Sequence, residues 1–363
     1  MRHERLLSCT RRAALGAVLG LSATLALPNV HAGEFDGVTL RVATWGGSWK
    51  KNFEDKIVPK MEAMGGTIEF VTGSPQANLA KLIAARGRAP FDVMEILDAQ
   101  EDDFREGDFL QKLDLGRIPN TADLEDFQYS DQWVATWTTQ EVICYNTEKF
   151  AELGIPVPAT YSDLDHPALE GRVMIPDITS GGGLANFGGL VHAAGGDETN
   201  VAPGLDLINQ LKIRKFWSRG GQTVTEYQSG DIYASISHAG WCQRAAMAGA
   251  PVASVHPRIN DAHTGVHKYG WMGIMKSTTD AKTIEAAHWF MNEYLDGDYQ
   301  YYFAKQSGVA PVNRKGLALM AEDPLVSKFM ITDLDKLGGF LRIDYGKVDI
   351  SQWMDQWNRA IAQ

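Results

Sequence analysis

Tryptophan, glycine and a few polar side chains stand where expected strands of this chain give way to helices. The first such place is the segment Trp45-Gly46-Gly47-Ser48, directly after an apolar strand. Glycines let a small molecule approach the backbone, and the free N–H groups at the start of a helix attract negative charge. The flat indole of Trp45 is suited to stacking or to contact with a cation, although it can also be a core residue. This pattern favours binding of a small molecule.

Three more turns follow expected strands. Asp98 comes after one strand and can either face a ligand or cap the next helix. Gly182 stands in the glycine-rich turn 179–183, which can cradle a carboxylate or phosphate group or act as a plain capped turn. His238 ends a third strand, and the helix after it carries Trp241 and Arg244. Ligands of open α/β sheets bind beyond the carboxyl ends of strands, so these turns are candidates for a binding site.

The sequence contains none of the common catalytic motifs. There is no G-x-S-x-G elbow, Cys–His signature or H-E-x-x-H motif, so we expect no catalytic residue, no cofactor and no enzyme activity. A hydrolytic enzyme is kept as an alternative. So is a metal-binding protein, because His256, Asp261, His263 and His267 lie within twelve residues. Their spacing matches no standard zinc pattern, and we therefore expect no metal ligand.

The first part of the mature chain alternates expected strands and helices, which is typical of α/β layers with largely parallel sheets. Ser48 is expected to cap a helix whose apolar residues recur every four positions up to Gly65. Ser74 and Pro75 open the next helix. The expected strands are 40–44, 67–71 and 91–97. This order is the start of a doubly wound lobe.

A second series of alternating elements begins near residue 142. Its expected strands are 142–145, 173–175, 232–237, 252–255 and 270–275, and its expected helices are 184–194, 241–248, 281–295 and a C-terminal helix with Trp353, Trp357 and Ile361. The chain has no internal repeat and no long linker, so composition does not mark a boundary between the two series.

Length and charge limit the possible functions. The chain has 363 residues, which is long for one compact core and sufficient for two lobes. A hydrophobic content of 44% with 22% charged residues is ordinary globular composition. The formal net charge of −11 argues against nucleic acid as a partner, since a basic surface supplies most of that affinity.

The first 32 residues have the pattern of an export signal. Four arginines form a basic start, and the apolar run 13–27 is shorter than the ~20 residues of a membrane-spanning helix. Small residues at Val30 and Ala32 predict cleavage after Ala32 and a periplasmic location. Residues 10–15 partly resemble a twin-arginine signal, so the export route stays open. Cleavage removes four arginines and one glutamate, which takes the net charge from −11 to −14.

Two cysteines, Cys144 and Cys242, remain in the mature chain. An oxidising compartment permits a disulfide between them, but two cysteines in a large exported protein do not require one. Their redox state therefore stays open.

Several segments together resemble the spermidine/putrescine-type group of bacterial extracellular solute-binding proteins. Each segment is weak by itself, but their order and spacing extend over nearly the whole mature chain. The segments are 41–48 (RVATWGGS), 90–93 (PFDV), 137–139 (WTT), 144–150 (CYNTEKF), 164–173 (LDHPALEGRV), 229–231 (SGD) and 308–313 (GVAPVN).

This resemblance implies two doubly wound α/β lobes that close on a ligand in the cleft between them. It places the crossings between lobes near Thr139, Met275 and Ala321. Such proteins are expected to be monomers that pass a small-molecule solute to the membrane permease of an ATP-driven importer and do no chemistry themselves. The implied N-terminal lobe is 33–138 plus 276–320, and the implied C-terminal lobe is 139–275 plus 321–363.

The resemblance adds Trp137, Thr138 and Trp271 to the expected site. At the positions of Trp241 and Trp271, polyamine binders carry carboxylates that hold ammonium groups, whereas this chain has tryptophans. A buried ammonium without a carboxylate loses its strongest contact, and a cation–π contact restores only ~1–2 kcal/mol. A polyamine-like or amino-acid-derived solute, and a ligand with a carboxylate or a flat ring, both remain open.

Overall fold

The computed structural model describes residues 33–362 of the chain. The expected leader, residues 1–32, and the cleavage expected after Ala32 lie outside the described residues. Within residues 33–362, no helix is both long enough and apolar enough to cross a membrane.

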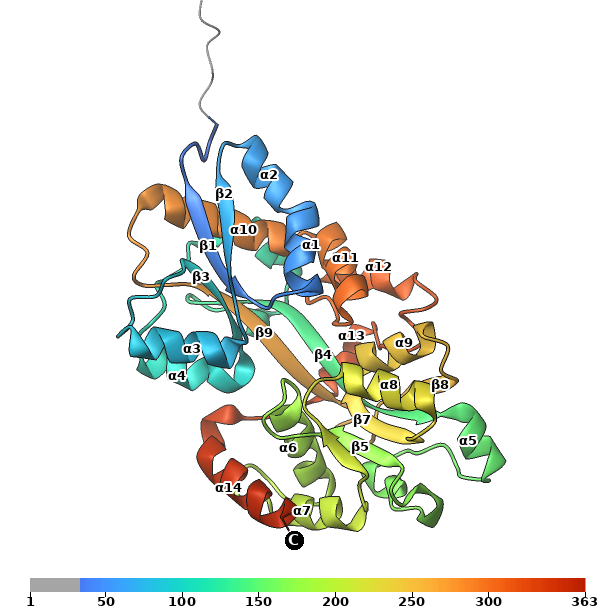
Figure 1. Cartoon of the computed structure of the whole chain (residues 1–363). Helices are drawn as coiled ribbons and strands as arrows, with labels where there is room; N and C mark the ends of the chain where they lie inside the picture. Colours follow the sequence, from blue (N-terminus) through green and yellow to red (C-terminus); the bar gives the residue numbers. More distant parts are fainter. Residues whose placement is uncertain (1–32, 363) are drawn as a thin grey trace, which may run out of the picture. The chain divides into compact units, whose positions relative to one another are not determined.

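The first half of the fold is a group of parallel strands in the order β2-β1-β3, flanked by helices (Figure 1). Branched and apolar residues favour the strands, and β3 is buried along its whole length. The strands are β1 (Thr39–Thr44), β2 (Thr67–Thr72) and β3 (Val93–Leu97), and the helices are α1 (Ser48–Lys56), α2 (Val58–Ala63), α3 (Pro75–Ala84), α4 (Glu101–Glu106), α10 (Ala281–Tyr294), α11 (Gly297–Ser307) and α12 (Arg314–Ala321).

The second half is a parallel group in the order β7-β5-β6. Its strands are β5 (Val173–Pro176), β6 (Lys215–Trp217), β7 (Ala234–His238) and β8 (Val252–Val255), and its helices are α5 (Thr147–Glu152), α6 (Gly183–Ala193), α7 (Ala202–Gln210), α8 (Gly221–Ser229), α9 (Ala239–Met247), α13 (Leu334–Gly338) and α14 (Ile350–Ile361).

Two long strands join the halves, as Figure 1 shows: β4 (Val134–Asn146) and β9 (Val266–Ile274). They pair antiparallel with each other, β9 also pairs antiparallel with β3, and β4 pairs antiparallel with β7 and β8. The short β10 (Leu341–Arg342) pairs parallel with β9. The α/β class expected from the sequence is therefore confirmed, but the sheet is mixed rather than largely parallel.

Three hydrophobic cores are formed by the described residues: one in the first half, and two in the second, the third of which holds Cys144, Tyr227 and Cys242. Strand β4 contributes to all three, and β9 contributes to the first and the second. On β4, Trp137 packs in the first core and Ile143 in the second. On β9, Val266 packs in the second core, whereas the residues from Tyr269 onward pack in the first. The crossing expected near Met275 falls at a residue that packs in the first core.

The single helix expected from Ser48 to Gly65 is wrong, because the structure has two helices there. The break lies at Ile57, between α1 and α2, and Pro59 occupies the first turn of α2. Proline lacks a backbone N–H and clashes with the carbonyl four residues earlier, so α1 cannot continue through it. Ser48 is also not the cap: it is the first residue of α1, and Gly47 with a φ of 64° precedes it.

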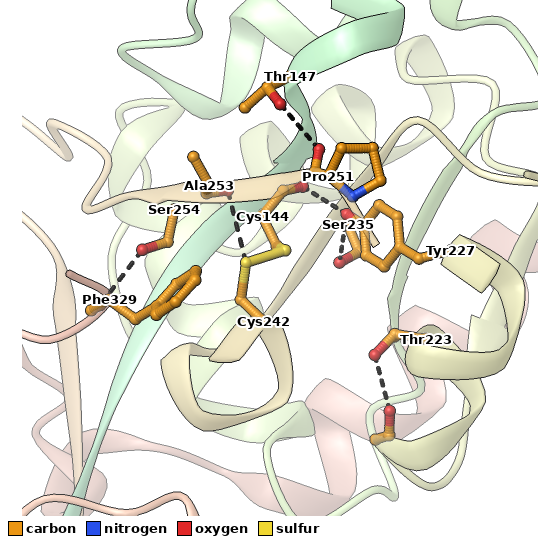
Figure 2. Close-up of a disulfide and its surroundings, with 11 residues drawn as sticks. Cys144, Thr147, Thr223, Tyr227, Ser235, Cys242, Pro251, Ala253, Ser254 and Phe329 are labelled. Atoms are coloured by element: carbon orange, nitrogen blue, oxygen red, sulfur yellow. Dashed lines mark hydrogen bonds between the residues drawn. A yellow bond between two sulfur atoms is a disulfide. The ribbon is translucent and has the colours of Figure 1, made fainter. Parts of the chain in front are cut away.

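A disulfide joins Cys144 of β4 to Cys242 of α9, with their Cα atoms 5.6 Å apart (Figure 2). The pairing that the sequence left open is thus present in this structure. The same part of β4 also holds α8: the hydroxyl of Tyr227 donates to the backbone oxygen of Cys144 at 2.6 Å and lies 3.1 Å from Ser235 Oγ. Helices α8 and α9 are therefore both fastened at Cys144.

Candidate ligand-binding site

A cavity of about 750 Å³ is lined by residues from both halves of the fold. Residues at or next to the N-terminal ends of α1, α3, α6, α8 and α9 lie in its wall, together with parts of β4 and β9. These helices follow strands, so the cavity lies beyond the carboxyl ends of strands, where open α/β sheets bind ligands. Its volume is within the roughly 300–1,000 Å³ usual for small-molecule sites.

Three tryptophans form the wall that belongs to the first half. Trp45 stands directly after β1, and its ring centroid lies 4.8 Å from that of Trp49 and 5.6 Å from that of Trp137. Trp49 and Trp137 meet edge to face at 5.3 Å. Edge-to-face packing fixes these rings against one another. Trp45 and Trp49 are half-buried, whereas Trp137 is almost fully buried.

The facing wall is built on α8 and α9. The guanidinium of Arg244 lies 4.5 Å from the ring centroid of Trp241 and donates to the backbone oxygen of Gln306 at 2.9 Å. Gly220 makes room for the indole, since a Cβ at that position would come within 1.9 Å of Trp241 Nε1. Burial lowers the pKa of Arg244. Arginine still stays protonated, so this wall carries a fixed positive charge.

Lys268 of β9 is a buried cation in the cavity wall. Its ammonium donates to the backbone oxygen of Gly181 at 2.6 Å and lies 5.1 Å from the ring centroid of Trp137. Burial lowers the pKa of Lys268, while the carboxylates of Glu141 and Asp98 oppose this shift. Lys268 therefore joins the tryptophan wall of the first half to the glycine-rich turn of the second.

Glu141 and His238 form a buried pair beneath the cavity. Glu141 Oε1 lies 2.6 Å from His238 Nδ1 and accepts from Thr139 Oγ1 at 2.7 Å, and Oε2 accepts from Asn186 Nδ2 at 2.6 Å. Burial alone would raise the pKa of Glu141, but the charge and hydrogen bond of His238 lower it below its usual range. The ionised Glu141 accepts the Nδ1 proton of His238 and so fixes the orientation of the imidazole.

The cavity wall is electropositive. Arg219, Arg244 and Lys268 line it, and among the residues that the structure describes no aspartate or glutamate does. No salt bridge within residues 33–362 involves these three cations. A wall that carries cations and no carboxylate attracts negative charge, so it favours an anionic ligand.

Four helices add backbone N–H groups to this wall. The N-cap residues of α1, α6, α8 and α9 (Gly47, Gly182, Gly220 and His238) make no side-chain capping bond. Helices α5 and α10 to α14, in contrast, all start with an Asn or Asp side chain that accepts from a helix N–H. Helices α2, α4 and α7 also lack such a cap, so a missing cap alone marks no site. The convergence of four uncapped ends on one cavity does favour an anionic ligand.

Most of the residues expected at the site line this cavity. The lining includes Trp45, Gly46, Ser48, Trp137, Gly182, His238, Trp241 and Arg244. Gly47, Asp98, Thr138 and Trp271 are not part of it.

The reason for the exceptions on strands is side-chain alternation, since neighbouring residues point to opposite faces. Trp137 and Thr139 of β4 line the cavity, so Thr138 between them does not, and its hydroxyl donates to the backbone oxygen of Lys268 at 2.9 Å. Trp271, three positions after Lys268, lies on the other face and stacks on Tyr269 with centroids 5.6 Å apart.

Asp98 lies away from the cavity because its carboxylate is used inside the fold. Its oxygens accept from the backbone N–H groups of Tyr269 at 2.8 Å and Ala99 at 2.9 Å. Burial raises the pKa of Asp98 to about 6. The residue lines a separate cavity of about 340 Å³ beside Arg342.

Sequence reasoning missed Trp49, Glu141, Arg219 and Lys268. The best available signal was a charged residue close to an apolar run, as with Glu141 before residues 142–145 in β4 and Lys268 before residues 269–274 in β9. Such a residue is costly to bury unless it has partners or a function. Arg219 offered no signal, because it stands in an ordinary polar turn.

The four residues considered for a metal site do not come together around one point. His256 lies 2.8 Å from Gln140 Oε1, and His267 packs on Phe340 with centroids 4.4 Å apart. Burial lowers the pKa of His256 to about 4 and that of His267 to about 3. Within residues 33–362, no group of three or more His, Cys, Asp or Glu side chains is placed to hold a metal ion.

A family model described as bacterial extracellular solute-binding protein matches residues 50–327. The chain belongs to this family. The resemblance expected from the sequence is thereby confirmed. Membership in this extracellular family implies export, a small-molecule ligand and a permease partner for this solute-binding protein. A search of curated proteins finds no match.

Solved structures share the fold of this solute-binding protein. An ABC transporter protein from Clostridium perfringens ATCC 13124 has a TM-score of 0.70 at 22% identity, over 88% of this chain and 99% of that one. MotA from A. tumefaciens B6, in complex with glucopine, has a TM-score of 0.69 at 19% identity, over 89% and 99%. PotD from Streptococcus pneumoniae, a spermidine/putrescine transporter substrate-binding protein, has a TM-score of 0.69 at 16% identity, over 90% and 98%. These likenesses confirm the two-lobed α/β fold class.

Proposed function

We propose that this protein captures a small organic solute with an anionic group and delivers it to the permease of an ATP-driven importer. The observation that supports the anionic group is the charge of the cavity wall. Arg219, Arg244 and Lys268 line it without a carboxylate beside them in the described lining. A ligand carboxylate would give these cations charge-assisted hydrogen bonds, which are roughly twice as strong as neutral ones.

A polyamine fits this wall poorly. Its ammonium groups would lie near Arg219, Arg244 and Lys268, and like charges brought together in a cavity repel. Glu141, a carboxylate bonded to the lining residues His238 and Thr139, is fully buried and already engaged by them and by Asn186. Of the two ligand classes left open by the sequence, the carboxylate or flat-ring class is therefore the one we propose.

We propose transport rather than catalysis. The Glu141–His238 pair resembles the acid–base part of a hydrolase, which would need a nucleophile within hydrogen-bond reach of the imidazole. Among residues 33–362, no serine, threonine or cysteine side chain is recorded in a hydrogen bond with His238. The pair has a structural use instead, since Glu141 also holds Thr139 and Asn186 in the cavity wall.

Thermal shift and calorimetry on the mature protein test the proposal. The panel holds organic anions, both aromatic and aliphatic, beside putrescine and spermidine. A ligand at 100 times its Kd stabilises the protein by about 2.7 kcal/mol, which raises Tm by several degrees. We expect an organic anion to bind and to be recovered unchanged after incubation.

A pair of variants locates the anion. Arg219→Gln should weaken anion binding at least tenfold, because it removes an exposed cation of the cavity wall. Arg88→Gln removes an exposed arginine outside the cavity and should leave binding unchanged. Binding of spermidine or putrescine with no anion bound would overturn the proposal, and so would turnover of the ligand.

A further inference from the structure

Half of the tryptophans of this chain line one cavity. The chain has ten, and the cavity wall holds Trp45, Trp49, Trp137, Trp217 and Trp241. Trp217 is held in place by its indole N–H, which donates to the backbone oxygen of Ile236 at 3.0 Å. Tryptophan offers the largest flat apolar surface of any side chain, so this concentration indicates a ligand with a flat body.

The aromatic and cationic parts of the wall come from different halves. Trp45 and Trp49 belong to the first half, next to β1. Arg219, in the turn before α8, and Arg244, on α9, belong to the second half. Lys268 stands between the two parts, near both Trp137 and Gly181. A ligand that satisfies both parts has a flat region at one end and an oxyanion at the other.

The aromatic wall is not arranged as a cage for an ammonium group. Trp137 already faces the ammonium of Lys268 at 5.1 Å, and Trp241 already faces the guanidinium of Arg244 at 4.5 Å. A cationic ligand group on these rings would approach a fixed positive charge of the protein. A neutral flat ring meets no such repulsion and gains contact area with Trp45 and Trp49.

We propose that the solute is a planar organic anion, a flat ring system that carries one carboxylate. Its ring lies on the tryptophan wall of the first half, and its carboxylate meets Arg219, Arg244 and the uncapped helix ends of the second half. The cavity of about 750 Å³ has room for a ring system of two rings. This inference rests on the proposed function and narrows its ligand class.

Four compounds of one skeleton test the two ends separately by calorimetry: 2-naphthoate, 2-naphthamide, 2-naphthylmethylamine and decahydro-2-naphthoate. The amide removes the charge, the amine reverses it, and the saturated acid keeps the charge but loses the flat ring. We expect 2-naphthoate to bind at least tenfold more tightly than each of the others. Binding should also change the tryptophan fluorescence, because the ring contacts indoles.

A variant pair links the preference to the wall. Trp45→Leu should bring the affinities for 2-naphthoate and decahydro-2-naphthoate within about threefold of each other by removing the flat surface. Trp289→Leu is the matched control, since Trp289 lies on α10 outside the cavity and packs on Phe35 with centroids 5.7 Å apart. It should leave the ratio unchanged.

The outcomes separate this inference from the proposed function. If the saturated acid or other aliphatic anions bind as tightly as 2-naphthoate, the inference that the ligand is flat is wrong. The proposal that the protein binds an organic anion is then kept. If the amine binds best, both are wrong. If none of the four compounds binds, the inference of a planar anionic ligand is also wrong. The wider panel of organic anions then tests whether the protein binds an anion at all.

Discussion

Glu95 is a fully buried carboxylate behind the tryptophan wall. It accepts from Thr44 Oγ1 at 2.7 Å, from Trp49 Nε1 at 3.1 Å and from the hydroxyl of Tyr294 at 3.1 Å. Burial raises the pKa of Glu95 to about 7, although these hydrogen bonds oppose the shift. The bond to Trp49 makes this carboxylate part of what orients the cavity wall.

The raised pKa predicts that the free energy of unfolding falls as pH rises. The folded protein holds the Glu95 proton with a pKa of about 7, against an ordinary 4.5, so this stabilisation is complete below pH 4.5 and is lost as pH rises through 7. The difference is worth roughly 3 kcal/mol. Urea unfolding at pH 5 and pH 8 should show a steeper loss in the wild type than in Glu95→Gln. Equal losses in the two proteins would contradict the raised pKa.

At the scale of elements, α9 carries Arg244, Arg219 stands in the turn before α8, and both helices depend on β4 for their position. Cys242 of α9 lies between Trp241 and Arg244 in the chain and is bonded to Cys144 of β4. Tyr227 of α8 donates to the backbone oxygen of the same Cys144 (Figure 2). A substitution of Cys144 is therefore expected to alter the position of both helices.

We predict that Cys144→Ser combined with Cys242→Ser lowers the free energy of unfolding by about 2–4 kcal/mol, because the bridge closes a long loop with a sequence separation of 98. The same variant should bind an anionic ligand more weakly, since Trp241 and Arg244 are less firmly held. Urea unfolding and calorimetry below the onset of unfolding measure the two effects. Treating the wild type with a reductant should reproduce both. Unchanged stability and affinity would show that the bridge has neither role.

At the scale of the whole molecule, the cavity wall combines residues that pack in separate cores of the two halves: Trp137 in the first core and Trp217 in the third. Trp45 belongs to the side of the first core, and Trp241 follows β7 in the second half. The long strands β4 and β9 connect the halves, because each has residues in the first core and in the second. A ligand that contacts both walls stabilises the arrangement in which the walls are close.

We therefore predict that a bound ligand makes the protein more compact. Small-angle scattering should show a smaller radius of gyration at a saturating concentration of a ligand verified by calorimetry. The control is Arg219→Gln at the same ligand concentration. This concentration is chosen below the Kd of the variant, so that most of the variant stays unbound. No change in the wild type with verified binding would contradict closure.

The sequence by itself determined the alternation of many strands and helices, the family and most of the candidate site, but it missed elements such as β6, α7 and α8. Turns such as Trp45-Gly46 and His238–Trp241 could be recognised because the rule that ligands bind beyond strand ends needs only local information. Helix starts were also mostly visible: Ser74 accepts from the N–H of Ala77, as its position before Pro75 predicted.

Only the tertiary structure decided which face each strand residue presents and which charges meet. Thr138 and Trp271 face away from the cavity because side chains alternate along β4 and β9. Both strands are buried along their whole length, so no alternation of polar and apolar residues in the sequence shows which face meets the ligand. Lys268 and Glu141 became functional candidates only when distant strands were paired. Pairing of β4 with β9 brought the buried cation Lys268 beside Trp137, and pairing of β4 with β7 brought the buried carboxylate Glu141 beside His238. Pairing between such distant strands depends on long-range packing, and no local pattern in a single sequence shows it.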